Sequence, residues 1–163
     1  MTNLILPHGS NELNTLYIED DMARASMLSA STEMRRLTIS SAAAANAVML
    51  AAGYFNPLEG FMNKEEALNV ATKMLTLNNI FWPIPIVNLT NDSNALDYTH
   101  GEEIALQDPN IEGNPVIAIQ RIESVSKLTD QEIDTMLTNI FGTNDDNHPG
   151  VKNFKLQGKH LIF

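Results

Sequence analysis

The side chains best suited to bind a metal ion or transfer a proton are four histidines, which lie far apart in the sequence: His8, His100, His148 and His160. The tightest group of candidate ligands is residues 145–148 (Asp-Asp-Asn-His), which places carboxylate, amide and imidazole groups in one segment. The histidines lack a recognisable metal-ligand spacing, and carboxylates ahead of a Pro-Gly pair are typical turn and cap residues. We therefore predict no metal site and interpret His148 as a residue that fixes this loop by hydrogen bonding.

Two pairs of adjacent carboxylates could be taken for an acid-base dyad: Glu65-Glu66 and Glu102-Glu103. Neighbouring side chains diverge on a helix and point to opposite faces on a strand. The first pair is therefore interpreted as residues that favour a helix start, and the second as part of a solvated strand edge.

A local excess of positive charge occurs near the C-terminus, where Lys152, Lys155 and Lys159 follow the last carboxylate, Asp146. These lysines could form an anion-binding strip or a solvated edge. Three spaced lysines are a weak charge cluster, so the solvated edge is favoured.

Sequence motifs for nucleotide binding and nucleophilic catalysis are missing. Neither Gly-x4-Gly-Lys-Ser/Thr nor Gly-x-Gly-x-x-Gly occurs, and Gly-x-Ser-x-Gly is missing as well. The chain has no cysteine, which excludes thiol chemistry and disulfides. We therefore assign no catalytic, cofactor-binding or metal-ligating residue and expect no cofactor.

The overall composition is that of a folded domain with an acidic surface. The 163 residues, 44% of them hydrophobic, suit a single domain over residues 1–163. The formal net charge of −10 opposes binding to a phosphate backbone, so no nucleic-acid partner is expected. Trp82 beside Phe81 could stack on bases, but no basic residues surround the pair, which favours core packing. No apolar run is long enough to span a membrane and no secretory signal is evident, so we expect a cytoplasmic protein without a membrane partner.

Three helices are predicted from their caps and apolar spacing. The first begins after Ser40 or Ser41 and ends at Gly53, the second follows Asn63, and the third lies between the capping box at Thr129 and Gly142. Strands are predicted at residues 103–107 and 116–122, and an edge or irregular strand with two prolines at residues 80–89. Residues 1–38 form an N-terminal arm that wraps the domain, and residues 143–150 form a polar loop. Strands gathered between helices indicate an α+β domain with a small curled sheet.

The connector at residues 53–62 (GYFNPLEGFM) is the most distinctive segment, because it carries several large apolar side chains between two predicted helices. An exposed loop would be mostly polar, so this turn is expected to fold onto a packed surface.

This turn and several other segments, in order, resemble the N-terminal, PUA-like domain of the ATP sulfurylase (sulfate adenylyltransferase) family. The other segments are residues 39–41 with the Ala-rich helix, 81–85, 104–109, 112–116 and 143–151. The resemblance spans Gly9 to Gly158 and is nearest to the form of sulfur-oxidising bacteria. It implies a PUA-like fold, a small sheet or pseudo-barrel with flanking helices.

In that family the enzyme interconverts ATP and sulfate with adenosine 5′-phosphosulfate and diphosphate. The resemblance places its Gln-x-Arg-Asn and His-x-Gly-His motifs in the next domain, and neither occurs here. It therefore implies a non-catalytic domain that braces the catalytic domain and the subunit contacts of a homo-oligomer. Without the catalytic domain, we expect an uncovered apolar patch near Tyr54, Phe55, Leu58 and Phe61.

Two alternatives remain: an RNA-binding module, which the acidic charge disfavours, and a stand-alone interaction protein. We expect the chain to be a fragment or truncated product, since it ends where the family's chain would enter its catalytic half.

Overall fold

The computed structural model describes residues 5–163, and the first four residues of the predicted arm lie outside this range. Its helices and strands follow in the order α1 (Asp21–Ala30), β1 (Arg35–Thr38), α2 (Ser41–Ala51), α3 (Lys64–Lys73), β2 (Leu89–Thr90), the 3-10 helix η1 (Ser93–Asp97), β3 (Glu103–Gln107), β4 (Val116–Arg121), β5 (Val125–Lys127), α4 (Asp130–Phe141), α5 (Pro149–Gln157) and β6 (His160–Ile162).

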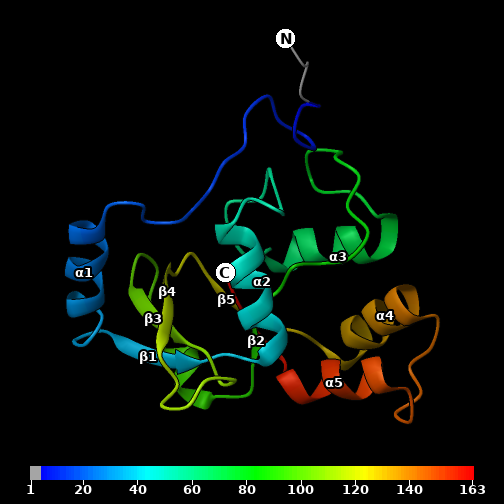
Figure 1. The fold of residues 1–163 in the computed structure, drawn as a ribbon. Helices are drawn as coiled ribbons and strands as arrows, with labels where there is room; N and C mark the ends of the chain where they lie inside the picture. Colours follow the sequence, from blue (N-terminus) through cyan, green and yellow to red (C-terminus); the bar gives the residue numbers. More distant parts are fainter. Residues whose placement is uncertain (1–4) are drawn as a thin grey trace.

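The strands form two small open sheets. In the first, with the order β1-β3-β4, β1 runs parallel to β3, and β3 runs antiparallel to β4. In the second, with the order β2-β6-β5, both pairs are antiparallel. The described residues therefore form an α+β fold of small sheets and flanking helices, and no closed barrel is present among them. Figure 1 shows α2 between the first sheet and α3, α4 and α5, while α1 stands apart beyond the sheet.

Helix caps determine where the predicted helices begin. The side chains of Ser40, Asn63 and Thr129 each accept a hydrogen bond from a backbone N–H three residues ahead. Each such bond satisfies an N–H group that the first helical turn leaves free. The three predicted helices are confirmed, with Ser40 as the cap of α2 in preference to Ser41.

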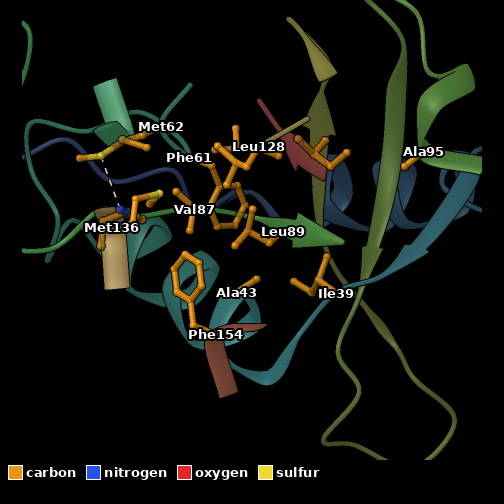
Figure 2. Packing of buried hydrophobic residues seen from close by; sticks show 14 of the residues in the cluster. Ile39, Ala43, Phe61, Met62, Val87, Leu89, Ala95, Leu128, Met136 and Phe154 are labelled. Carbon is orange, nitrogen blue, oxygen red and sulfur yellow. Dashed lines mark hydrogen bonds between the residues drawn. The ribbon is translucent and has the colours of Figure 1, made fainter. Parts of the chain in front are cut away.

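One continuous core joins the two sheets to α2, α3, α4 and α5. Figure 2 shows Phe61, Val87, Leu89 and Leu128 gathered near Phe154 of α5. Each of these side chains is less than a tenth exposed. Because α2 contributes the small side chains of Ala43 and Ala44 to this core, its backbone can lie close to its neighbours.

The N-terminal arm lies against the body, as expected of a segment that wraps the domain, but several of its apolar side chains are not buried. Leu13, Leu16 and Tyr17 are 59%, 44% and 54% exposed. The arm also contains α1 and β1, and β1 belongs to a sheet because it pairs with β3. Residues 35–38 are therefore part of the folded body.

The proline-containing segment and the C-terminal region also differ from the prediction. Residues 82–88 form no regular strand, and β2 is limited to Leu89–Thr90, because proline cannot donate to a sheet hydrogen bond. After the polar loop, α5 begins at Pro149, which suits the first helical position because its missing N–H is not needed there.

Candidate functional site

The turn at residues 53–62 begins with a hydrogen-bonded end to α2. Gly53 has a φ of 76° and donates to the carbonyl oxygen of Leu50, and Tyr54 donates to that of Met49. This pair of bonds is a Schellman motif, which needs a residue in the left-handed conformation after the helix. Glycine adopts this conformation without a steric penalty, so Gly53 sets the direction in which the chain leaves α2.

Asn56 joins the turn to the N-terminal arm. Its side chain is buried, with 4% of the residue exposed. The Oδ1 atom accepts from the backbone N–H of Asn14 at 3.0 Å, and the Nδ2 atom donates to the carbonyl oxygen of His8 at 3.2 Å. Nearby, the Leu16 N–H donates to the carbonyl oxygen of Ala51 at 2.9 Å. The arm is thus held by polar contacts at the turn and at the end of α2.

The apolar residues of the turn are divided between the core and the surface. Phe61 and Met62 are 6% and 1% exposed, and Phe55 and Leu58 are half-buried against the core. Tyr54 is exposed. The expected patch was therefore wrong for Phe61, because that side chain faces inward with Val87 and Leu89, as Figure 2 shows.

Trp82 packs in the core, as predicted. It is 7% exposed, and its ring meets Phe55 edge-on at 5.9 Å between centroids. His8 lies on another side, at 6.0 Å, and its Nε2 atom is hydrogen-bonded to the carbonyl oxygen of Phe81. Phe81 itself is exposed. The indole ring is therefore enclosed by the arm and the turn and is not available for base stacking.

The loop at residues 145–148 contains turn and cap residues. His148 caps α5, with Nδ1 accepting from the Val151 N–H at 3.4 Å. Asp145 accepts from the backbone and side-chain N–H groups of Asn147, and these bonds lower the pKa of the Asp145 carboxyl. Within residues 5–163, no three His, Asp or Glu side chains are grouped as metal ligands would be.

Two of the three C-terminal lysines are paired with carboxylates. Lys155 Nζ lies 2.6 Å from Asp146 Oδ1, and Lys159 contacts Asp130. The hydrogen bond that Lys155 donates to Asp146 raises the pKa of Lys155, and the one that Lys159 donates to Asp130 lowers the pKa of Asp130. Because these partners neutralise much of the strip's charge, the arrangement favours a solvated edge over an anion site.

The adjacent glutamates occupy structural positions. Glu65 and Glu66 lie in the first turn of α3. Glu102 accepts from the Thr99 N–H and pairs with Arg35 at 3.3 Å, and Glu103 lies opposite Arg121 in the pairing of β3 with β4. Neither pair brings two carboxylates together at a shared proton.

An open groove of about 1360 Å³ lies between the arm and the body. Its walls come from the arm, α1, α2, the turn and β4, with Leu16, Met27, Val48, Leu58, Ile117 and Ile119 among the apolar lining residues. This groove was not predicted from the sequence. The signal for it in the sequence is the group of apolar residues within 13–28, most of which are exposed in the structure.

Several known proteins are similar to this chain over most of its length. The chain matches the PUA-like domain family over residues 5–162. It is 43% identical over 162 residues to the sulfate adenylyltransferase of Alcanivorax borkumensis, covering 99% of this chain and 40% of that protein. The sulfate adenylyltransferase of Allochromatium vinosum is 39% identical, with 98% and 40% covered, and that of the Riftia pachyptila sulfur-oxidizing endosymbiont is 35% identical, with 98% and 36% covered.

The chain thus spans about 40% of the length of these relatives. Among solved structures, it resembles a protein described as a hexameric APS kinase from Thiobacillus denitrificans, with a TM-score of 0.65 and 27% identity. That match covers 78% of this chain and 24% of the other. Within the described residues, no helix combines the length and apolar character needed to cross a bilayer.

Proposed function

The chain belongs to the PUA-like domain family, and on that premise we propose that it is the N-terminal domain of a sulfate adenylyltransferase. The observation that carries this proposal is the match of 99% of the chain to 40% of the Alcanivorax enzyme. The whole enzyme would convert ATP and sulfate into adenosine 5′-phosphosulfate and diphosphate, with the chemistry residing in its other part.

We propose that this domain is not catalytic by itself. Transfer between sulfate and a nucleotide phosphate depends on positioning the reactants and neutralising their charge. Several cations here already face carboxylates within the domain: Arg24 with Asp21, Arg35 with Glu102, Lys64 with Glu132, Lys155 with Asp146 and Lys159 with Asp130. This pairing supports a structural role.

In the complete enzyme the domain would brace the catalytic domain and contribute to subunit contacts. The Thiobacillus protein with a similar domain is described as hexameric, which supports an oligomeric enzyme here. We place this enzyme in the cytoplasm and expect it to bind neither RNA nor membranes, since the net charge of −10 opposes contact with phosphate groups.

Sulfate-dependent exchange between ATP and diphosphate tests the proposal. We expect no exchange from the purified 163-residue chain. A chimera in which the chain replaces the matched segment of the Alcanivorax enzyme should be active. Robust exchange by the chain alone would contradict the non-catalytic role, and a folded but inactive chimera would contradict the domain assignment. A salt-sensitive RNA complex of the chain would contradict the exclusion of nucleic acid.

A further inference from the structure

Helix α1 lacks the packing that normally stabilises a helix of its length. None of its ten residues is buried. Isolated helices shorter than about 12 residues are marginal in water, and most helices in proteins depend on packing of an apolar face. The Asp20 side chain caps α1, but a cap contributes only about 1 kcal/mol. A further surface is therefore needed to cover α1.

The apolar side chains that such a surface would cover line the groove. Met27 and Leu28 of α1 are 39% and 55% exposed, and Val48 of α2 is 50% exposed. Across the groove, residues 116–120 of β4 are only half-buried. Figure 1 shows the arm running past the end of α2 to reach α1, which stands away from the body. The groove thus has an apolar lining, and one of its walls is α1, which the N-terminal arm connects to the body.

We propose that this groove holds the part of the chain that follows this domain in sulfate adenylyltransferases, with α1 packing against that part. This inference rests on the proposed function. Phe163 lines the groove, directly after β6. A chain that continues beyond Phe163, as in relatives of about two and a half times this length, would therefore begin inside it.

The charge of the groove favours this occupant over a second copy of the chain. Glu19, Glu59, Glu66 and Glu123 line it with Arg24 and Arg121. These arginines already pair with carboxylates, Arg24 with Asp21 and Arg121 with Glu123 at 3.9 Å. A second copy would bring its own net charge of −10 to this acidic rim. The occupant we infer has an apolar centre and a basic border.

Hydrogen exchange followed by mass spectrometry tests the proposal, by comparing the 163-residue chain with the chimera. In the chain alone, peptides covering residues 21–30 should exchange rapidly at every protein concentration. In the chimera, we expect these amides to exchange at least about tenfold more slowly, while α4 changes little. Protection that appears in the chain alone as its concentration rises would instead indicate a second copy and would overturn the proposal.

A pair of substitutions gives the matched control. Leu28 and Leu96 are each 55% exposed, but only Leu28 lines the groove. In the chimera, Leu28→Asp should remove most of the added protection of α1, and Leu96→Asp should leave it intact. Equal effects of the two substitutions would contradict a docking role for the groove.

The two proposals fail in different ways. An active chimera with unprotected α1 would overturn the groove assignment and leave the proposed function intact. A folded, inactive chimera with protected α1 would support the groove and contradict the proposed function. If the chimera does not fold, hydrogen exchange measured on the unmodified Alcanivorax enzyme tests the inference instead. Rapid exchange in its segment aligned with residues 21–30 would overturn the inference, and slow exchange would support it.

Discussion

Asn56 in the turn after α2 accepts a hydrogen bond from the backbone N–H of Asn14 in the N-terminal arm, 42 residues earlier, at 3.0 Å. The same side chain donates to the His8 carbonyl oxygen, so one buried amide satisfies two backbone groups of the arm. The turn that identifies the family in the sequence therefore also anchors the segment leading to α1. The turn therefore lies between the core, to which it contributes Phe61 and Met62, and the exposed groove, whose wall it helps to form.

Replacing Asn56 with alanine should release the arm. The substitution removes the hydrogen bonds to the Asn14 N–H and the His8 carbonyl, and each such bond contributes about 0.5–1.5 kcal/mol. We expect the free energy of unfolding, measured in urea, to fall by that amount for each bond lost, and cleavage within residues 8–20 by a protease to become faster. Asn94→Ala, at an exposed position in η1, is the control. Unchanged cleavage of the arm in Asn56→Ala would show that Asn56 does not hold it.

Replacing Gly53 with alanine should cost more than the same change at Gly142. Each glycine directly follows a helix and has a positive φ, 76° for Gly53 and 72° for Gly142. In both variants the alanine would adopt the left-handed conformation, which costs about 1 kcal/mol. A Cβ atom at Gly142 has no neighbour within 4 Å, but one at Gly53 would lie 2.8 Å from the Asn14 carbonyl oxygen. We expect a further loss of about 1 kcal/mol at Gly53 in urea unfolding. Equal losses would mean that the arm moves aside freely.

Local signals in the sequence were enough to locate the helices that belong to the core. Ser40, Asn63 and Thr129 cap α2, α3 and α4 because a side-chain oxygen in the right place satisfies a free N–H whatever the tertiary structure is. Helix α5 had comparable signals, with Pro149 at its first position and Val151 and Phe154 on its buried side. Helix α5 was nevertheless not predicted, because its first residues were included in the polar loop predicted at residues 143–150.

The arm and the groove were beyond what local patterns could indicate. The apolar residues of α1 contact no core, so their presence in the sequence suggested burial that the isolated domain does not provide. β1 contains one apolar residue, Leu37, and pairs with β3, which lies some 70 residues away. The groove brings together the arm, α1, α2, the turn and β4, which are also far apart in the sequence. The family resemblance indicated the PUA-like fold, but a groove formed by segments far apart in the sequence has no local pattern that predicts it.

Gly158 should be the glycine least tolerant of substitution. Its φ is 120°, and a Cβ atom there would lie 2.2 Å from the carbonyl carbon of Thr90. Thr90 is in β2, which pairs with β6 just after Gly158, so the clash is between two backbones that cannot separate without breaking the sheet. We expect Gly158→Ala to lower the free energy of unfolding by about 3 kcal/mol or more. Gly113→Ala, with a φ of 83° and open space around it, is the control. Similar losses in the two variants would contradict this account.

Glu132 should contribute stability that disappears in acid. Burial raises the pKa of its carboxyl, but hydrogen bonds from Lys64 of α3 and from the Thr129 N–H and hydroxyl outweigh burial, and the pKa lies below its usual 4.5. Lys64 Nζ lies 2.8 Å from Glu132 Oε1, so the ionised carboxylate links α3 to α4. A pKa lowered by folding gives stability that is present above the unfolded value of 4.5 and is lost as the pH falls through the folded value.

We therefore expect Glu132→Gln to lower the free energy of unfolding at pH 7 by about 0.5–1 kcal/mol, since partly exposed ion pairs contribute little. Glutamine can still accept from the Thr129 N–H, so the capping geometry is retained and mainly the charge is removed. The difference between wild type and variant should shrink as the pH is lowered below 4.5, which urea titrations over a series of pH values would measure. Glu65→Gln, at an exposed position in the first turn of α3, serves as the control. A difference at Glu132 that stays constant down to the lowest pH would show that the charge of this carboxylate does not stabilise the contact between α3 and α4.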